Sequence, residues 1–501
     1  MLRNSRCFSS FIRQGRNIYH YNHYNRVGQC HAIVRTLSTA TAAAEDIHRI
    51  PPKLDLAYYA NNTEAIATNM RLRNYESDSV YQVKELYSKL ASLEAEAHKL
   101  RDERDQVNQL IRSAPTPEKR KEYINQAKQW KDQLRQMELQ INGMENELTT
   151  QALQIPNDTH PETPVGPEEN AKILKIVGKP RQGGKEIKDH VTIAEKLDMI
   201  DFEQASLVTG SKFYYLKNYG AWLEFALIQY AMHKAAARGF SPVLAPDMVR
   251  TSIAYGCGFQ PRKKEASQIY EVTTASTVNT TAPKLCLVGT AEIPLAGLSA
   301  TKVFAEEELP KKIVGFSHAF RAEAGHGSAE ERGLYRVHQF SKVELFCVTT
   351  PEQSEAMLAE LRTLQEDMFA ELGLCFRVLD MPTEELGASA HRKYDMEAWM
   401  PGKNGWGEIS STSNCTDYQT RRLDIRYLSK EFKENVGSKD VRVPWSVKEK
   451  WVNYCHTLNG TAMAVPRVII ALLETHQRPD GSVDVPLALR KWIPGEPSVL
   501  K

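Results

Sequence analysis

Two long runs of regularly spaced apolar residues constrain the fold of this chain more than any other feature. Pro115 and Pro117 separate the two runs. Within each run the apolar residues recur at steps of three and four, which is the period of an α-helix. The pattern predicts two helices of roughly 35 residues, joined by a Pro-containing turn of about five or six residues. The residues in question are Val83, Leu86, Leu90, Leu93, Ala97, Leu100 and Val107, then Ile124, Ala127, Trp130, Leu134, Met137, Ile141, Met144 and Leu148.

Two such helices joined by a short turn form an antiparallel hairpin. At 1.5 Å per residue each helix would extend about 50 Å, well beyond a globular body. The pattern favours a projecting hairpin. It leaves open two other arrangements, namely helices folded against the main body and a coiled coil that dimerises the chain.

The first 44 residues have a composition of their own. They contain six Arg, no Lys, several Ser and no acidic residue before Glu45. Such a start is typical of a mitochondrial transit peptide, and no continuous apolar stretch suits a secretory signal. A disordered basic tail is the alternative. Removal of this segment would lower Lys plus Arg from 64 to 58 against 62 acidic residues, so overall charge does not indicate nucleic-acid binding.

The rest of the chain predicts a two-part organisation. Ile155–Gly166 is short, polar and Pro-rich, which is typical of a linker. Beyond it, several strand-like segments follow one another without regular helical crossovers. This order favours an α+β fold, with an antiparallel sheet flanked by helices. We therefore predict a transit peptide over residues 1–44, a helical arm over 45–160 and a catalytic domain over 161–501.

Composition excludes some classes of protein. No run of about twenty apolar residues occurs, so we expect no membrane span. Six Cys lie beyond the first 44 residues, widely scattered and without a CxxC pair. This spacing argues against a disulfide framework and against a compact zinc site.

The stretch from Phe316 to Phe346 predicts a ligand site. Two patterned segments flank a middle rich in Gly, Ala and charge, which indicates a strand, a loop and a returning strand. Alternate residues of a strand share a face, so Arg321, Glu323, Arg336 and Glu344 should lie together on one face of a sheet. Two guanidiniums beside two carboxylates suit a ligand that carries phosphates, a carboxylate and an ammonium.

This stretch resembles motif 2 of the class II aminoacyl-tRNA synthetases, and of the seryl-tRNA synthetases in particular. Three further segments agree in order and spacing: GTAEIPLAGL from Gly289, GEISSTSNC from Gly407 and LNGTAMAVPR from Leu458. Arg238–Met248 resembles motif 1, with Pro246 on a strand that faces a second subunit. The helical hairpin resembles the tRNA-binding arm of the family. The resemblance covers nearly everything after residue 51, and it implies a class II antiparallel sheet and a homodimer.

The resemblance also implies an ATP site. Arg321 would contact the α-phosphate and the serine carboxylate, while Phe340 and Arg467 would lie on opposite faces of the adenine ring. Glu408 and Ser411 would hold Mg²⁺ together with the ATP phosphates, because magnesium prefers hard oxygen ligands. No zinc is expected. The implied nucleotide-binding residues are Arg321, Ala322, Glu323, Arg336, Val337, Phe340, Glu408, Ile409, Ser410, Ser411 and Arg467.

Serine would be held by a second set of residues. The resemblance assigns Thr290, Ala291, Glu292, Arg321, Glu344 and Thr461 to this role. Two carboxylates can neutralise the ammonium, and a site that pairs the substrate hydroxyl discriminates against alanine. Arg321, Glu344 and Arg467 would be the catalytic residues, acting through positioning and electrostatics rather than as nucleophiles. We interpret His338 as a structural strand residue and His326 as part of the loop.

The activity implied is that of a mitochondrial-matrix serine--tRNA ligase, with tRNA(Ser), serine and ATP as substrates. Two alternatives are a relative that charges a carrier protein and a catalytically altered RNA-binding protein. The first should have lost the arm, and the second some of Arg321, Glu344, Glu408 or Arg467. The basic residues of the second helix are candidate contacts for tRNA phosphates: Lys119, Arg120, Lys121, Lys128, Lys131 and Arg135.

Overall fold

The computed structural model describes residues 50–182, 184, 186–260, 269–273, 284–323, 333–432 and 449–501. The predicted transit peptide, His326 and most of the loop after Glu323 lie outside the described residues.

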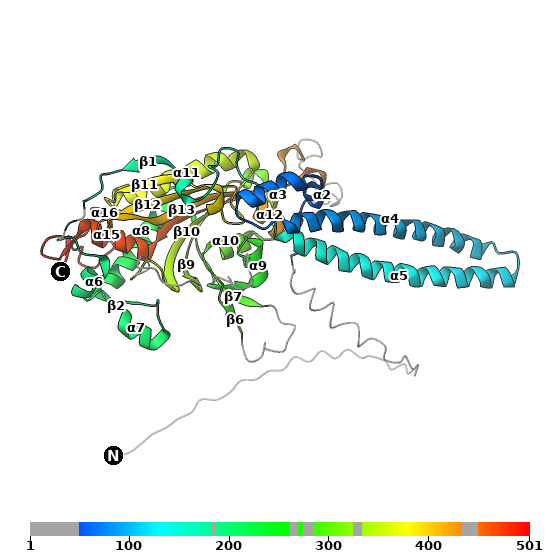
Figure 1. Ribbon diagram of the computed structural model, residues 1–501, viewed down its shortest axis with the longest axis horizontal. Coiled ribbons are helices and arrows are strands. Elements are labelled where there is room, and N and C mark those ends of the chain that lie inside the picture. Colours follow the sequence, from blue (N-terminus) through cyan, green and yellow to red (C-terminus); the bar gives the residue numbers. More distant parts are fainter. Residues whose placement is uncertain are drawn as a thin grey trace, which may run out of the picture.

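A long antiparallel hairpin projects from the main body (Figure 1). Its helices are α4 (Asp78–Arg112) and α5 (Pro117–Leu153), and the short helices α2 (Leu56–Asn61) and α3 (Thr63–Leu72) pack at its base. Thr116 caps α5 by accepting a hydrogen bond from Lys119 N, and Pro117 occupies the first turn, where its missing N–H costs little. The turn is therefore shorter than predicted, because Pro117 belongs to the helix.

The predicted apolar stripes form the interior of the hairpin. Val83, Leu90, Ala97, Leu134 and Leu148 are buried between α4 and α5 or at their base. Most other stripe positions are half-buried. Val107 is also buried, and Ile124, near the tip, is 46% exposed. The prediction of a projecting hairpin is confirmed, and an arrangement with both helices folded along the body is wrong.

The segment Ile155–Gly166, predicted to be a linker, is held firmly against the body. Asn157 is buried, and its side-chain amide donates to the backbone oxygens of Ser389 and Cys415 at 2.9 and 2.8 Å. Arg73, which follows α3, is completely buried and donates to the backbone oxygens of Asn157 and Ala390. These contacts tie the base of the hairpin to the body.

An eight-stranded sheet forms the centre of the body. Its strand order is β1-β11-β12-β13-β16-β10-β9-β4, and every neighbouring pair is antiparallel except β4 and β9. The predicted antiparallel sheet flanked by helices is confirmed, with one parallel pair at its edge. The strands are β1 (Lys172–Val177), β4 (Ser241–Leu244), β9 (Lys311–Phe320), β10 (Gln339–Thr349), β11 (Phe376–Asp380), β12 (Arg392–Met400), β13 (Gly405–Thr416) and β16 (His456–Ala464).

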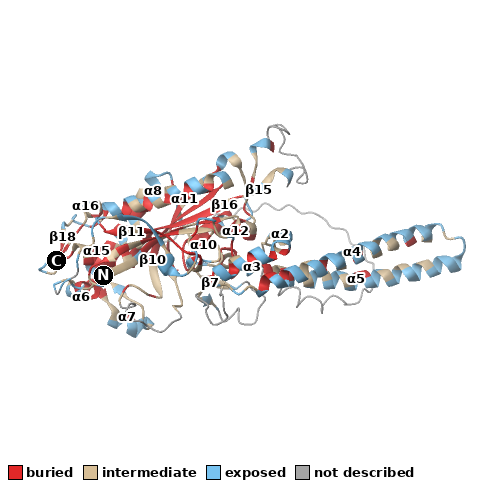
Figure 2. Ribbon diagram, turned by 45° about the horizontal axis from the view of Figure 1, so that its top comes forward, coloured by how far each residue is buried: buried red, intermediate tan, exposed pale blue. Residues whose placement is uncertain are grey.

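Alternation along β10 places successive side chains on opposite faces of the sheet, and both faces are buried. Val343, Leu345 and Cys347 belong to the main core, together with apolar residues of α8 (Asn218–Ala237), α11 (Ser354–Glu371) and α15 (Val465–His476). Lys342 and Glu344 have the opposite parity and share the other face. Figure 2 shows that the buried residues concentrate in the sheet and its covering helices, whereas the hairpin is largely exposed.

Shorter elements complete the body. Six described cysteines are free and buried. None of the helices in the described ranges is long and apolar enough to cross a membrane. The shorter helices are α6 (His190–Lys196), α7 (Phe202–Thr209), α9 (Thr251–Gly256), α10 (Glu292–Ser299), α12 (Tyr418–Leu423) and α16 (Leu487–Arg490). The shorter strands are β2 (Ile200–Asp201), β3 (Tyr215–Leu216), β5 (Met248–Arg250), β6 (Glu271–Val272), β7 (Leu285–Leu287), β8 (Val303–Ala305), β14 (Arg426–Leu428), β15 (Val452–Tyr454), β17 (Val483–Asp484) and β18 (Val499–Leu500).

Pro246 does not lie on a strand. It falls in the connection between β4 and β5. The expectation that it occupies a strand is therefore wrong, because the chain leaves the sheet edge after Leu244.

Candidate active site

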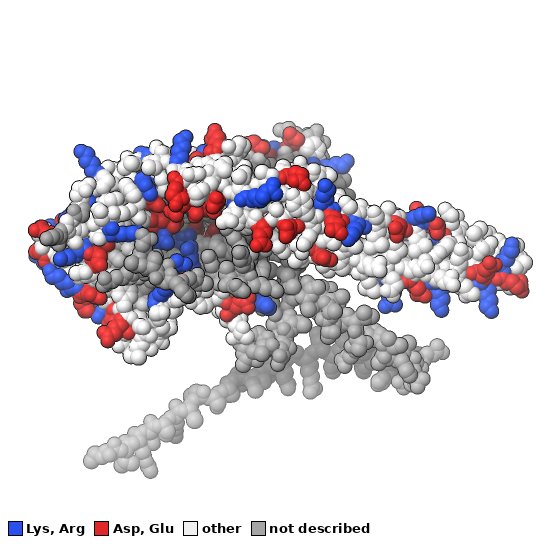
Figure 3. Space-filling view, in the orientation of Figure 1, with Lys and Arg blue, Asp and Glu red and all other residues white. Residues whose placement is uncertain are grey.

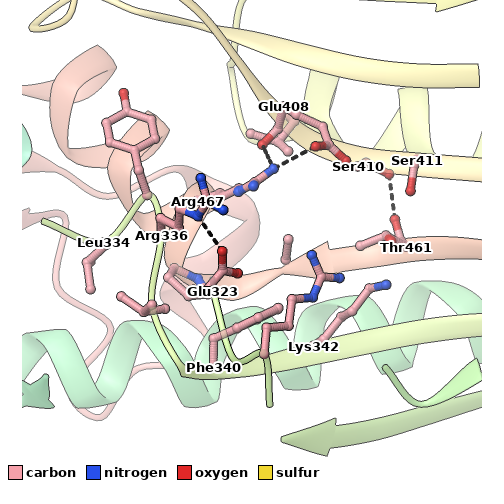
Figure 4. A pocket seen from close by; sticks show the side chains of 16 residues that line it. Glu323, Leu334, Arg336, Phe340, Lys342, Glu408, Ser410, Ser411, Thr461 and Arg467 are labelled. Atoms are coloured by element: carbon pink, nitrogen blue, oxygen red, sulfur yellow. Dashed lines mark hydrogen bonds and ion pairs between the residues drawn. The ribbon is translucent and has the colours of Figure 1, made fainter. Parts of the chain in front are cut away.

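A pocket lies where β10, β13 and β16 meet the start of α15 (Figure 4). Most of the residues predicted to bind ATP line it, although they come from distant parts of the chain. The lining residues are Arg321, Glu323, Leu334, Tyr335, Arg336, Val337, Phe340, Lys342, Glu408, Ile409, Ser410, Ser411, Thr461, Ala464, Pro466 and Arg467. Of the predicted site residues, Thr290, Ala291, Glu292, Ala322 and Glu344 are not part of this lining.

Three charged residues reach the pocket from outside the strands on which they were expected. The ladder between β9 and β10 ends at the pair Phe320 and Gln339. Arg321 and Glu323 follow β9, and Arg336 precedes β10, so the prediction that they lie on strands is wrong. Glu323 has a positive φ of 42°, which is not a strand conformation. The structure nevertheless brings the three together, with an ion pair between Arg336 Nε and Glu323 Oε2.

Arg321 and Arg467 place two guanidiniums in one pocket. The Arg321 guanidinium lies 5.3 Å from the centroid of the Phe340 ring. Desolvation in the pocket, followed by the nearby charge of Arg467, lowers the pKa of Arg321 from its usual value. Desolvation acts on Arg467 too, but the charge of Glu408 instead raises the pKa of Arg467, so both guanidiniums remain cationic and can bind an anion.

Glu408 is kept ionised at the pocket. Arg467 Nη1 donates to Glu408 Oε2 at 2.8 Å and to the backbone oxygen of Glu408 at 3.0 Å. Desolvation alone would raise the pKa of Glu408, but the charge of Arg467, aided by Lys393, outweighs it and lowers that pKa to about 2. Ser411 lines the same pocket, so the two residues supply hard oxygen donors of the kind that magnesium takes.

A second cluster adjoins the pocket beneath Thr461. Glu344 is 1% exposed and its Oε2 accepts from Thr290 Oγ1 at 3.3 Å and from Thr461 Oγ1 at 3.5 Å. Lys342 Nζ lies 2.6 Å from the same oxygen and donates to Thr290 Oγ1 at 3.1 Å. Lys342 was not among the residues predicted from the sequence. It lies two residues from both Phe340 and Glu344, so the alternation of side chains along a strand could have placed it on the same face.

Glu292 lies beside this cluster, buried at the start of α10. Its Oε1 accepts from Gln419 Nε2 at 2.6 Å and from Asn459 Nδ2 at 3.0 Å. Burial, with a smaller contribution from the charge of Glu344, raises the pKa of Glu292 to about 7. Neither Gln419 nor Asn459 was predicted, because they lie more than a hundred residues along the chain from Glu292. Ala291 next to it is completely buried.

The described histidines near the pocket have structural partners. His338 Nδ1 lies 2.8 Å from Tyr270 Oη and 3.0 Å from the backbone oxygen of Arg321, and its ring stacks on Phe213. His318 Nδ1 lies 2.9 Å from Asp247 Oδ2. Among the described residues, no group of three His, Cys, Asp or Glu side chains could hold a metal ion. Whether the protein carries zinc stays a prediction.

The fold and the pocket together define a class II aminoacyl-tRNA synthetase. Residues 274–439 match the family model described as the tRNA synthetase class II core domain (G, H, P, S and T). Residues 54–159 match the model of the seryl-tRNA synthetase N-terminal domain. The second match covers the hairpin and the short helices at its base.

Similar proteins specify the family within that class. The chain is 42% identical to the serine--tRNA ligase of Treponema denticola over 87% of its own length and 97% of that protein. It is 39% identical to the mitochondrial serine--tRNA ligase of Schizosaccharomyces pombe over 92% of both chains. A crystal structure of seryl-tRNA synthetase from Pyrococcus horikoshii complexed with ATP matches with a TM-score of 0.78 and 31% identity, over 89% and 99% of the two chains. The chain therefore belongs to the serine--tRNA ligases, which are ATP-dependent aminoacyl-tRNA synthetases.

Proposed function

We propose that this chain activates serine with ATP in mitochondria and transfers it to the 3′ end of tRNA(Ser). One observation carries the assignment of the site. A single pocket holds two guanidiniums, an aromatic ring and an ionised carboxylate, and it adjoins the buried Glu344, Thr290 and Thr461. An anion-binding half beside a half that can hold an ammonium and a hydroxyl is what an ATP and serine site requires.

The nucleotide half is assigned to the pocket itself. We place adenine against the ring of Phe340, with Arg467 over its opposite face and Glu323 near its amino group. Arg321 and Arg336 are assigned to the phosphates. The other proposed contacts come from Ala322, Val337, Ile409, Ser410 and Ser411. The ATP complex of the Pyrococcus horikoshii relative supports a nucleotide site in this fold.

Magnesium fits the donors at Glu408 and Ser411. A carboxylate with a pKa of about 2 remains anionic at every physiological pH, and the same pocket is lined by Ser411 with its hydroxyl. One or two such side chains suffice, because Mg²⁺ takes its remaining ligands from phosphates and water. Bound there, the ion would neutralise charge on the ATP phosphates.

The serine half is assigned to the cluster around Glu344. Glu344 and Glu292 would receive the ammonium, and Thr290 and Thr461 would complete the hydrogen bonds, with Ala291 shaping the floor. Burial makes these partners selective, because alanine would leave a buried polar group unpaired.

Catalysis then needs no covalent nucleophile from the protein. An oxygen of the serine carboxylate attacks the α-phosphorus of ATP, its bond to phosphorus forms, and pyrophosphate leaves to give seryl-adenylate. A hydroxyl at the tRNA 3′ end next attacks the carbonyl carbon of the adenylate, and AMP leaves. Arg321 and Arg467 stabilise the charge that develops at phosphorus, while Glu344 holds the amino acid in line.

The hairpin is proposed to bind tRNA(Ser). Lys119, Arg120 and Lys121 are exposed at the start of α5 near the tip, and Lys128, Lys131 and Arg135 are exposed along the same helix. Figure 3 shows positive and negative side chains interspersed along the hairpin, so recognition would rest on local phosphate contacts rather than on overall charge. This fits recognition of RNA by shape and backbone.

Two further points concern location and assembly. The Arg-rich, acid-free first 44 residues and the mitochondrial relative from Schizosaccharomyces pombe support mitochondrial import.

Leu244 on β4 is 87% exposed, and Trp222 and Phe225 on α8 are also exposed, which supports a homodimer that covers these residues. Mass measurement by light scattering and localisation of a fluorescent fusion of the first 50 residues test the two points.

The proposal is tested by ATP–pyrophosphate exchange across a panel of amino acids, followed by charging of tRNA(Ser). We expect serine alone to support exchange. Exchange with alanine or threonine but not serine would refute the substrate assignment. Reversal of charge at Lys119 and Lys121 should weaken tRNA charging and leave exchange intact; a carrier-charging or scaffold protein would not show this division.

A further inference from the structure

A buried set of contacts outside the pocket holds one of its walls. The wall is the segment Leu334–Val337, which returns to β10 and lines the pocket. His190, the first residue of α6, is buried behind it. The backbone nitrogen of Leu334 lies 3.2 Å from His190 Nε2, and the ring of Tyr335 packs edge-on against the imidazole at 5.4 Å.

These contacts determine which nitrogen of His190 carries the proton. A backbone N–H can only donate, so Nε2 of His190 must accept from Leu334. Nδ1 then carries the hydrogen and points at Glu474 Oε1, 3.2 Å away. Glu474 is itself buried, and its two oxygens also accept from His190 N at 3.1 Å and from Gly402 N at 2.8 Å. The imidazole is thus held in one orientation from three sides.

The same helix supplies both the anchor and a pocket residue. Glu474 and Arg467 both belong to α15, and Arg467 lines the pocket near the start of that helix. His190 therefore links α15 to the segment that carries Arg336 and Val337. The buried hydrogen bond from Leu334 N to His190 is one of the contacts that set the position of this wall relative to Arg467.

Two glycines leave the space that this arrangement needs. A Cβ atom at Gly333 would lie 2.2 Å from His190 Nε2, and the φ of +74° at Gly333 also disfavours other residues. A Cβ atom at Gly402 would lie 2.9 Å from Glu474 Cδ. The chain therefore approaches His190 and Glu474 closely at both glycines, and a larger residue at either position would disturb their contacts.

We propose that His190 is a positioning residue for ATP. Its Nε2 accepts the Leu334 N–H and so fixes the wall from which Arg336 and Val337 face the nucleotide. The inference rests on the proposed assignment of the pocket to ATP. Serine binding should depend on His190 much less, since Glu344, Thr290 and Thr461 come from β10, β16 and the segment before α10.

Two substitutions separate the two nitrogens of the ring. His190→Gln can place a carbonyl oxygen near the position of Nε2 and keep the acceptor for Leu334, whereas His190→Asn keeps a donor near Nδ1 and loses that acceptor. In ATP–pyrophosphate exchange at saturating serine, we expect His190→Asn to raise KM for ATP about tenfold, as the loss of one buried hydrogen bond implies. KM for serine should change less than about twofold, and His190→Gln should recover most of the affinity for ATP.

A second pair of variants tests the same contact if a substitution at His190 prevents folding. Gly333→Ala presses on Nε2 from the other side and should also raise KM for ATP. Gly495→Ala is its matched control, because Gly495 has a similar φ of +78° with nothing within 4 Å of an added Cβ. Equal changes of the two KM values in His190→Asn, or equal effects of His190→Gln and His190→Asn, would overturn the inference.

A different set of results is expected if the pocket does not bind ATP. Phe340→Ala should raise KM for ATP if the pocket binds the nucleotide. No effect of Phe340→Ala would refute the pocket assignment. A clear effect of Phe340→Ala without one of His190→Asn and Gly333→Ala would refute the role of His190 alone.

Discussion

The affinity for serine should depend on pH through Glu292. This carboxyl is 6% exposed, and its pKa is raised to about 7, first by burial and then by the charge of Glu344. The hydrogen bond from Gln419 and the charge of Lys342 offset part of this rise. An acid with a raised pKa is protonated over a wider range of pH, so lowering the pH removes the negative charge that the serine ammonium would meet.

The size of the effect follows from that pKa. A single group with a pKa of about 7 is ionised to about 90% at pH 8 and about 10% at pH 6. If serine binds only the ionised form, its affinity falls about tenfold between these two values. Binding of the ammonium should in turn lower the pKa of Glu292, so that serine binding releases a proton near neutral pH.

The assay is KM for serine in ATP–pyrophosphate exchange at saturating ATP, measured at pH 6, 7 and 8. Glu292→Gln is the control, because an amide keeps the acceptor for Gln419 and cannot titrate. We expect KM for serine to rise as the pH falls in the wild type and to stay high and flat in Glu292→Gln. A wild-type KM that is constant from pH 6 to 8 would refute the reasoning, as would an equal slope in the variant.

Three further changes test other parts of the structure. Lys342→Met leaves Glu344 buried without its ammonium partner and should lower the free energy of unfolding by about 3–5 kcal/mol, measured by urea denaturation, and also raise KM for serine. Arg73→Met removes the donors to the backbone oxygens of Asn157 and Ala390, the first of which keeps a hydrogen bond from Asn69 Nδ2, and should cost about 1–3 kcal/mol by the same method, without a change in KM for ATP. Glu408→Gln should reduce exchange at least about tenfold at every pH from 6 to 8, because the wild-type carboxylate never protonates in this range.

Periodicity predicted the elements that bury one face. The apolar stripes predicted α4 and α5, since a helical face must match a partner over its whole length. Alternation also assigns Phe340 and Glu344 of β10 to one face, although both faces of this strand are buried. Segments with one buried face were therefore accessible from sequence.

Periodicity could not predict the position of residues that lie on irregular backbone or that meet only through tertiary packing. The ladder of β9 and β10 ends before Arg321 and Arg336, and no repeat in the sequence marks that end. Gln419 and Asn459 reach Glu292 from α12 and β16, so their role depends on tertiary packing alone. His190 and Glu474 are likewise 284 residues apart. Only a resemblance to a family could name the loop residues of the pocket, and it could not name these partners.

The pKa values of the two site carboxylates, Glu408 and Glu292, are shifted in opposite directions. Glu408 is surrounded by cations, and their charge overcomes desolvation, so it stays ionised with a pKa of about 2. Glu292 has amide partners and a neighbouring carboxylate, and desolvation prevails, so its pKa is about 7. The first carboxylate is suited to a cation that must stay in place through the reaction. The second exchanges a proton near neutral pH, which lowers the cost of keeping a buried acid in an empty site, and a bound ammonium would favour its charged form.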